Sequence, residues 1–389
     1  MSSHPGLEGG PIYLDYNATT PVDPEVAEVM WPYLLQHFGN PSSTHSYGQQ
    51  AHRGIVQARQ QVADLLECSS EEILFTGGGS ESDNLAIRGI ALANNQRGKH
   101  VITQVTEHPA VLNVCHALHR LHGFEITLLP VDRYGLIDLA ELDRSLRDDT
   151  VLVTIMHANN ETGTLQPLKE IAQIVHQRGS LLHSDGAQSV GKISVHPREL
   201  GVDLFTIAGH KLYAPKGIGA LYVRRDLLNR LEPVIYGGGQ EHGRRAGTES
   251  VAAIVGLGKA CQLAAEQLLA SQTRLRALRD NFQQMLEQAL PGRVHLNGHP
   301  AERLPNTLNI RVDGISGEQT LANLSGLASS TGSACHEGLT EPSGVLTAMG
   351  LTSPQALSAL RLTLGRWTDE AQIAEAARLL LQEISSPHH

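Results

Sequence analysis

The chain has 389 residues, a formal net charge of −10 at pH 7 and a hydrophobic content of 41%. The acidic surplus argues against nucleic acid as a direct partner, because a phosphate backbone would be repelled and the only adjacent arginines are the pairs at 224–225 and 244–245. Residues 1–10 contain neither a basic segment nor an apolar core, and no stretch approaches the length of a membrane span. We therefore expect a cytoplasmic protein that binds neither nucleic acid nor a membrane.

The hydrophobic pattern predicts two domains. Helices are expected over 25–36 and 49–66, and alternating apolar strands and helical stretches then continue to about residue 260, which is typical of an α/β domain with a mainly parallel sheet. A long helical segment covers 250–289, and the apolar spacing of 369–384 predicts a last helix on a smaller α/β domain. We assign residues 16–260 to the large domain, and 1–15 with 261–389 to the small one.

A glycine-rich turn follows the first apolar run of the large domain. Residues 73–75 lead through Gly77, Gly78 and Gly79 to Ser80, and a helix is expected over 85–93. Glycines allow backbone N–H groups to approach an anion, and a helix N-terminus adds partial positive charge, so this turn predicts a phosphate cradle. It lacks the GxGxxG fingerprint and the Gly-Lys-Ser/Thr ending of nucleotide-binding loops.

Two later apolar runs end in residues with chemistry. One run, 181–185, ends at Asp185, and the other, 202–208, is followed by His210 and Lys211. A lysine amine forms a Schiff base with an aldehyde, and a carboxylate can keep a pyridine ring protonated. The carboxyl ends of parallel strands meet at one edge of a sheet, so Asp185 and Lys211 are predicted to share one crevice. The alternative is an ordinary turn acid and a surface lysine.

The four cysteines are Cys68, Cys115, Cys261 and Cys335, and their spacing does not indicate a metal site. We interpret the first three as buried or incidental, since they fall in or beside expected helices. Cys335 lies in a stretch of small and polar residues, which predicts a mobile loop.

Several short segments together form one signature set: 14–21, 38–43, 106–108, 159–163, 209–211, 237–241, 245–249, 332–335 and 360–362. In this order they cover almost the whole chain, and the set resembles the cysteine desulfurases, which are class V aminotransferases of the fold-type I pyridoxal-phosphate enzymes. The resemblance implies a large domain with a mainly parallel seven-stranded sheet, a bound pyridoxal 5′-phosphate and a homodimer.

The resemblance also implies a role for each matching residue. Lys211 forms the Schiff base, Asp185 faces the pyridinium nitrogen, Gln188 donates to the phenolic oxygen, and His108 stacks on the ring and assists proton transfer. The phosphate is held by Gly79, Ser80 and His210, and by Thr248 from the second subunit. Asn160 positions cofactor or substrate, Asn17 contacts the substrate, and Arg361 clamps its carboxylate. The position of Arg361 in an apolar run disfavours the alternative of a surface cation.

The implied reaction converts L-cysteine to L-alanine and leaves the sulfur on Cys335 as a persulfide. An acceptor protein, such as an iron–sulfur scaffold or a thiolation protein, would then take the sulfur for iron–sulfur cluster, thio-cofactor or tRNA biosynthesis. Two residues depart from the common pattern. Ala208 stands where many desulfurases carry serine. His336 directly follows Cys335, and a histidine after the nucleophile resembles the pattern of the animal selenocysteine lyases. A selenocysteine lyase and a catalytically silent scaffold or carrier are the alternatives.

Overall fold

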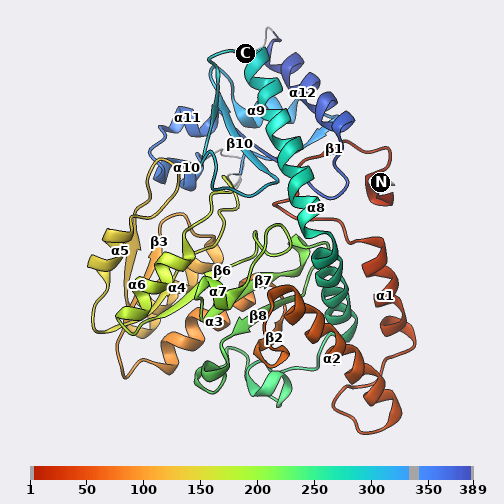
Figure 1. Cartoon of the computed structure of the whole chain (residues 1–389), viewed down its shortest axis with the longest axis vertical. Helices are drawn as coiled ribbons and strands as arrows, with labels where there is room; N and C mark the ends of the chain where they lie inside the picture. The colour runs from red at the N-terminus through yellow and green to blue at the C-terminus, as the bar shows by residue number, and fades with distance from the viewer. Residues whose placement is uncertain (1–3, 333–340, 387–389) are drawn as a thin grey trace.

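The structure is a computed structural model that describes residues 4–332 and 341–386. A large sheet with its helices forms the lower part of the molecule in Figure 1, and a small sheet with a second group of helices forms the upper part. Cys335 lies outside the described residues.

The large sheet has seven strands in the order β2-β8-β7-β6-β5-β3-β4. Its strands are β2 (Ile73–Thr76), β3 (His100–Gln104), β4 (Glu125–Leu129), β5 (Thr150–Thr154), β6 (Leu181–Asp185), β7 (Leu204–Ala208) and β8 (Gly219–Val223). Only β8 runs antiparallel to its neighbours β2 and β7, so the predicted mainly parallel seven-stranded sheet is confirmed. All strands except the edge strand β4 are buried along their length, which explains why they read as continuous apolar runs.

Helices cover both faces of this sheet, and alternate residues of β2 enter different cores. Ile73 and Phe75 pack in one hydrophobic cluster with α2, whereas Leu74 packs in another with Leu85 and Ile90. The helices of this part are α1 (Pro24–Leu35), α2 (Ser46–Leu66), α3 (Gly79–Ala93), α4 (Pro109–His122), α5 (Leu139–Ser145), α6 (Leu168–Gln177) and α7 (Pro197–Leu200). Short 3-10 turns are η1 (Pro5–Leu7), η2 (Ser70–Glu72), η3 (Gly209–Lys211), η4 (Arg225–Arg230) and η5 (Gln240–Gly243).

Helix α3 begins at Gly79, earlier than the predicted start at residue 85. Gly78 has φ 145°, a conformation that side chains rarely adopt, and it ends the turn so that the helix starts at once. Residues 80–84 lie before the predicted start of the helix. They are the first turns of the helix instead.

The small sheet is antiparallel, in the order β12 (Ala359–Thr363), β10 (Thr307–Val312) and β9 (Val294–Leu296). Its core joins these strands to α8 (Val251–Ala289) and α12 (Glu370–Ile384), with Phe282 fully buried between them. Near it lie a two-residue pairing of β1 (Ile12–Tyr13) with β11 (Leu327–Ala328), and the helices α9 (Gly317–Ala322), α10 (Gly344–Ala348) and α11 (Ser353–Leu357).

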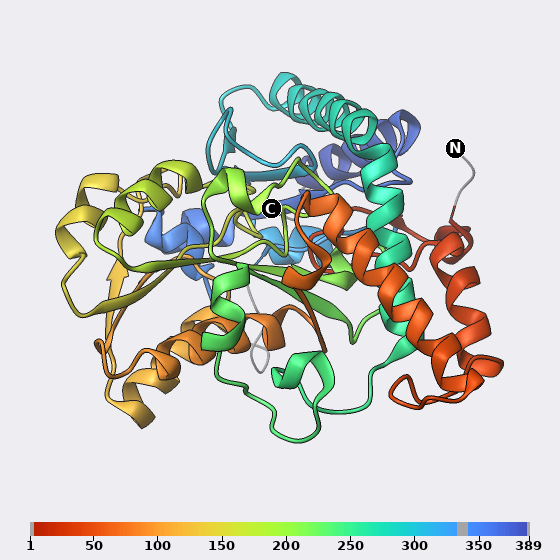
Figure 2. The same ribbon diagram turned by 60° about the horizontal axis from the view of Figure 1, so that its bottom comes forward.

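Helix α8 connects the two parts of the molecule. It packs on α1 and α2 at one end and on α12 at the other, as Figures 1 and 2 show. The predicted domain boundary between residues 260 and 261 falls inside this helix. The assignment of residues to two domains stays a prediction.

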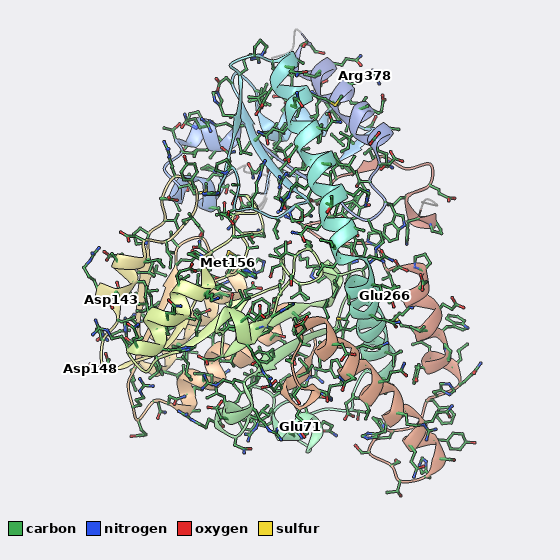
Figure 3. The ribbon with its side chains drawn as sticks, viewed as in Figure 1. Glu71, Asp143, Asp148, Met156, Glu266 and Arg378 are labelled. Atoms are coloured by element: carbon green, nitrogen blue, oxygen red, sulfur yellow. The ribbon has the colours of Figure 1, made fainter. Side chains whose placement is uncertain are left out.

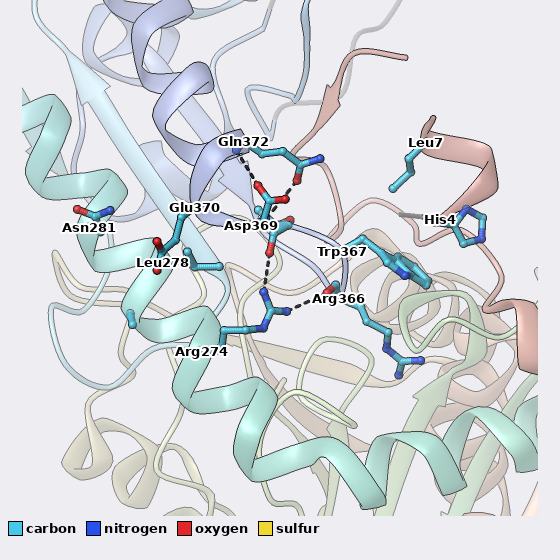
Figure 4. Close-up of a pocket in the computed structure, with 12 residues that line it drawn as sticks. His4, Leu7, Arg274, Leu278, Asn281, Arg366, Trp367, Asp369, Glu370 and Gln372 are labelled. Carbon is cyan, nitrogen blue, oxygen red and sulfur yellow. Dashed lines mark hydrogen bonds between the residues drawn. The ribbon is translucent and has the colours of Figure 1, made fainter. Parts of the chain in front are cut away.

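A cavity of about 540 Å³ lies between α8, η1 and the loop before α12 (Figure 4). Arg274 donates from Nη1 to the carbonyl of Thr368 at 2.5 Å and from Nη2 to the carbonyl of Arg366 at 2.9 Å, so it holds this loop in place. Within the described ranges, no helix combines the length and the apolar character needed to cross a bilayer.

Candidate active site

A second cavity, of about 630 Å³, lies at the carboxyl ends of β6 and β7, where the large sheet meets β12. Met156, which lines it, is labelled between the upper and lower parts of the molecule in Figure 3. Ten of the predicted site residues line this one cavity: Asn17, Gly79, Ser80, His108, Asn160, Asp185, Gln188, His210, Lys211 and Arg361.

Asp185 is the last residue of β6, and its register partner Thr206 lies two residues before the end of the parallel strand β7. This pairing brings the acid and the lysine after β7 to the same edge of the sheet. Asp185 Oδ1 accepts a hydrogen bond from the backbone N–H of Ala187 at 2.8 Å. Burial raises the pKa of Asp185 above its ordinary value, while that hydrogen bond and the charges of His108 and Lys211 oppose the rise.

Lys211 ends the short turn η3 that follows β7. Its Nζ donates to the backbone carbonyls of Asn17 and Ala18, both at 2.6 Å. Burial, together with the positive charge of Arg361, lowers the pKa of Lys211 to about 8. The uncharged amine, which a nucleophile or base requires, is therefore far more populated near neutral pH than in an ordinary lysine.

His108 caps the N-terminus of α4, and its Nδ1 accepts from the backbone N–H of Ala110 at 3.1 Å. Burial lowers the pKa of His108, so the neutral ring predominates at pH 7. A backbone N–H can only donate, and it therefore assigns the proton of the neutral ring to Nε2. His108 presents a donor at that atom.

The glycine turn places the N-terminus of the 15-residue helix α3 at the cavity. The first backbone hydrogen bond of the helix runs from the Ser82 N–H to the Gly78 carbonyl, so the N–H groups of Gly79 and Ser80 have no acceptor within the helix. His210 lies nearby on η3, and its Nδ1 is 3.1 Å from Thr19 Oγ1. Burial and the charge of Lys211 lower the pKa of His210 to about 4.

Arg361 comes from β12 of the small sheet and reaches the cavity from the opposite side. Its Nη2 lies 2.9 Å from Asp15 Oδ1, and its Nη1 donates to the Asn160 carbonyl at 3.3 Å. Its Nε is buried and has no hydrogen-bond partner among the residues that the structure describes. A buried orphan donor costs free energy, which a ligand carboxylate would recover.

Among the described residues, one predicted site residue does not line the cavity. Thr248 is exposed, in the segment that follows η5. Cys335 lies outside the described residues, but Ser330 upstream is bonded to the site because its carbonyl accepts from the Arg361 N–H at 2.8 Å.

Comparison with known proteins decides the family. A profile of the family described as Aminotransferase class-V matches residues 12–375. Cysteine desulfurase IscS of Dictyoglomus turgidum is 46% identical over 364 residues, which cover 93% of this chain and 91% of the relative.

The chain belongs to the cysteine desulfurases of the class-V aminotransferase family.

Solved structures agree with this cysteine desulfurase fold. A NifS-like protein superposes with a TM-score of 0.89 at 34% identity, covering 96% of this chain and 99% of the other. The structure described as SspA in complex with cysteine has a TM-score of 0.81 at 36% identity, with coverages of 92% and 99%. The predicted fold class and family are confirmed.

The class-V aminotransferases and the cysteine desulfurases among them depend on pyridoxal phosphate. The cavity of this desulfurase suits that cofactor. An acid lies at one strand end and an amine at the next, and the N–H groups at the start of α3 lack helical acceptors, as a phosphate site needs. Ala208 also faces the cavity, and a Cβ built on Gly79 would come within 3.1 Å of the Ala208 Cβ. Both small residues leave space beside the helix N-terminus.

Four residues in or beside the cavity are not among the predicted ones: Thr19, Asp83 and Lys216 in its lining, and Lys192 behind it. The Asp83 carboxyl is buried, and its Oδ1 has no hydrogen-bond partner among the described residues, although His183 Nε2 lies 3.7 Å away. Asp83 lies four residues after Gly79, so a predicted helix starting at Gly79 would have placed both residues on the same helix face. Lys192 is four residues beyond Gln188, and nothing in its neighbourhood in sequence marks it.

Proposed function

We propose that this cysteine desulfurase holds pyridoxal 5′-phosphate in the cavity and converts L-cysteine to L-alanine, passing the sulfur to Cys335. The observation that carries the proposal is the convergence of Asp185, His108, Lys211 and Arg361 on one cavity. The acid and lysine come from the large sheet and the arginine from the small one, so the site has separate places for cofactor and substrate carboxylate.

The cofactor would occupy the side of the cavity formed by the large sheet. Gly79, Ser80 and His210 would hold its phosphate, Asp185 and Gln188 would contact its ring, and Lys211 would bond to its aldehyde. When bound, the pyridoxal ring supplies a sink for the negative charge that develops when the substrate Cα loses its proton. Ionisation of Asp185 is expected to be favoured by a cationic ring nitrogen, because that charge offsets the burial that raises its pKa.

Arg361 would receive the substrate carboxylate. Its guanidinium already bonds Asp15, yet its Nε remains unpaired and buried. A carboxylate that accepts from Nε would satisfy this donor and fix the orientation of the amino acid. Asn160, whose carbonyl accepts from Arg361 Nη1, would hold the guanidinium in the plane needed for that contact.

Lys211 would move the proton and His108 would support the leaving group. Lys211 Nζ has a lowered pKa and can take the Cα proton in its uncharged form. His108 has its Nδ1 occupied by the Ala110 N–H, so its Nε2–H is a hydrogen-bond donor. A base acting from Nε2 would need the other tautomer, which this hydrogen bond disfavours. We therefore assign to His108 the role of a hydrogen-bond donor to the departing side of the substrate.

The sulfur transfer balances without an outside oxidant. The Cβ–S bond of cysteine breaks, an S–S bond to Cys335 forms, and Cβ gains a hydrogen to become the methyl group of alanine, so the substrate carbon is reduced as the sulfur is oxidised. Cys335 is five residues beyond Ser330, which is bonded to Arg361. Five extended residues span at most about 17 Å, so the chain keeps Cys335 within reach of the cavity.

We also propose a homodimer. Trp31, Leu34, Leu35, Phe38 and Tyr47 form an exposed apolar patch on α1, α2 and their connection, with Phe38 71% and Trp31 60% exposed. Apolar side chains gathered in this way mark an interaction surface, and a second copy of the chain is the occupant that the family resemblance implies. That copy would bring its own Thr248 to this subunit's phosphate site. The sulfur acceptor and the cellular compartment stay predictions.

The function is tested by measuring alanine and sulfide released from L-cysteine by the purified protein loaded with cofactor, with a reductant present. We expect equimolar alanine and sulfide, and loss of both in Lys211→Ala. Parallel measurement of selenide from L-selenocysteine separates the alternative, because turnover confined to that substrate would identify a selenocysteine lyase. No turnover of either substrate by a protein that has bound the cofactor would reject the proposed reaction.

A further inference from the structure

Behind the cavity wall lies a buried amine that the proposed function does not use. Lys192 is not among the residues that line the cavity. Its Nζ lies 2.7 Å from Gln188 Oε1 and 3.0 Å from Asn17 Oδ1. Both of these partners line the cavity, so Lys192 is hydrogen-bonded to the site through them.

Gln188 has its side-chain amide held at both ends. Its Oε1 accepts from Lys192, and its Nε2 donates to the backbone carbonyl of Asn17 at 3.0 Å. An ammonium or amine N–H donates and a carbonyl accepts, so the two contacts agree on which end of the amide is oxygen and which is nitrogen. An amide nitrogen carries two hydrogens and the Asn17 carbonyl uses one. The second hydrogen is left for a ligand in the cavity.

Asn17 connects this amide to the rest of the site. Its carbonyl accepts from Gln188 Nε2 and from Lys211 Nζ, and its Oδ1 accepts from Lys192 and from Asn306 Nδ2 at 3.1 Å. Its own Nδ2 donates to the Asn160 carbonyl at 3.2 Å and to Thr307 Oγ1 at 2.9 Å. All the polar atoms of the Asn17 side chain are thus engaged within the protein, and Asn17 serves as a frame for its neighbours.

We infer that Lys192 is a positioning residue: it fixes the Gln188 amide with the nitrogen toward the cavity, so that this nitrogen donates to the phenolic oxygen of the pyridoxal ring. The inference rests on the proposed function. Without Lys192, the Gln188 amide has one anchor left, and rotation by half a turn would place an acceptor, rather than a donor, against that oxygen.

Burial also affects Lys192 itself. Desolvation, with the charges of Lys211 and Arg361, lowers the pKa of Lys192 well below its ordinary value. Its N–H groups suffice for both acceptors, on Gln188 and on Asn17.

The test uses the visible absorbance of the protein loaded with pyridoxal 5′-phosphate, because a hydrogen bond to the phenolic oxygen changes the bound chromophore. Lys192→Met keeps an unbranched side chain as far as Cε and removes the donor nitrogen. We expect its absorbance maximum to move in the same direction as that of Gln188→Met, and its cofactor dissociation constant to rise roughly three- to tenfold, as expected for loss of one hydrogen bond. The double variant should match Gln188→Met alone.

The matched control is Lys169→Met, which makes the same exchange at an exposed position on α6 and should leave the spectrum unchanged. An unchanged spectrum in Lys192→Met, or shifts that add in the double variant, would overturn the inference. If Lys192→Met does not fold, Lys192→Gln retains a shorter donor and should give a smaller shift in the same direction, and no shift would again overturn it. A wild-type protein without any visible band would instead reject the proposed cofactor.

Discussion

At the scale of single residues, the site depends on side chains whose protonation is set by burial. Lys211 is the clearest case, because a solvent-exposed lysine has a pKa near 10.4, whereas burial and Arg361 lower the pKa of Lys211 to about 8. Only the uncharged amine attacks an aldehyde. The reactive form of Lys211 is thus available at a pH where an ordinary lysine is almost entirely charged.

We predict that the cofactor-free protein captures pyridoxal 5′-phosphate at a rate that rises with pH and levels off above about pH 8. Deprotonation removes the charge, so the rate increases as the pH rises through the pKa of Lys211. Stopped-flow absorbance between pH 6.5 and 9.5 measures it. The reference is Nα-acetyl-lysine, whose reaction should keep accelerating toward its pKa of about 10.4. A capture rate that follows the reference curve would contradict the lowered pKa.

Burial also sets the protonation of the cysteine thiols that the structure describes. Burial raises the pKa of Cys68 and of Cys115 to about 12, and it raises the pKa of Cys261 as well. These three thiols are almost wholly protonated at neutral pH and are poor nucleophiles. Their environment supports the interpretation that they are structural.

We predict that Cys335→Ala abolishes sulfide release from L-cysteine, because the substrate sulfur loses the thiol that accepts it as a persulfide. The visible spectrum of the bound cofactor should stay unchanged. Cys68→Ala is the control. It removes a partly buried thiol and should retain activity. Sulfide production and absorbance are measured on both proteins. Full activity in Cys335→Ala would show that the nucleophile lies elsewhere.

At the scale of elements, the contact between β7 and α3 shapes the phosphate end of the cavity. Ala208 is the last residue of β7, and Gly79 is the first residue of α3. A Cβ on Gly79 would meet the Ala208 Cβ at 3.1 Å, which is closer than most carbon contacts. Two small residues therefore face each other where the family pattern often has a serine hydroxyl.

We predict that Ala208→Ser lowers the dissociation constant of pyridoxal 5′-phosphate by roughly three- to tenfold, because the added hydroxyl gives one more hydrogen bond to the phosphate. The absence of a side chain on Gly79 leaves room for it. Gly79→Ala is the opposing variant and should weaken binding by crowding position 208. Titration of the cofactor-free proteins measures both. Equal affinities of Ala208→Ser and wild type would mean that position 208 does not reach the phosphate.

At the scale of the whole molecule, buried acids make the stability of the cofactor-free protein depend on pH. Burial raises the pKa of Glu107 to about 8, although the Met156 N–H donates to its Oε1 at 2.6 Å. The folded protein therefore binds this proton at pH values where the unfolded chain, with a glutamate pKa of about 4.3, has released it. The stabilisation is complete below that lower value and is lost as the pH rises through about 8.

We predict that the free energy of unfolding falls between pH 6.5 and 8, and that Glu107→Gln flattens this fall by up to about 1.4 kcal/mol per pH unit, the effect of one proton. Above pH 6.5 the buried His157 and His183 no longer oppose the trend, because burial lowers the pKa of His157 to about 4 and of His183 to about 3. Urea unfolding at several pH values measures the slope. Glu170→Gln, at an exposed position of α6, is the control. Identical slopes for Glu107→Gln and wild type would contradict the assignment.

The exposed apolar patch on α1 and α2 can be tested as the proposed dimer contact. Phe38→Asp should convert the proposed dimer to a monomer, because it places a charge within the apolar patch, and it should weaken cofactor binding by withdrawing the partner's Thr248. Leu269→Asp is the control, since Leu269 is 78% exposed on α8 but lies outside the patch. Light scattering after gel filtration gives the mass. A wild-type protein that is already monomeric would refute the proposed homodimer.

The sequence alone determined the family, the type of sheet and the ends of β6 and β7, because hydropathy patterns and strand-end residues are local properties of the chain. Asp185 and Lys211 could be paired in advance since neighbouring parallel strands end at the same edge. The start of α3 could not be predicted, because the spacing of apolar residues carries no information about the backbone conformation of Gly78.

Contacts across long sequence separations were decided only by the tertiary structure. Arg361 reaches Asp15 because β12 pairs with the segment around Asp15 at Thr363, and Lys192 meets Asn17 because the turn after β6 lies against that segment. The tautomer of His108 follows from a hydrogen bond at the cap of α4. Each of these depends on how buried polar groups find partners in a packed interior, which is a property of the fold as a whole rather than of any one segment.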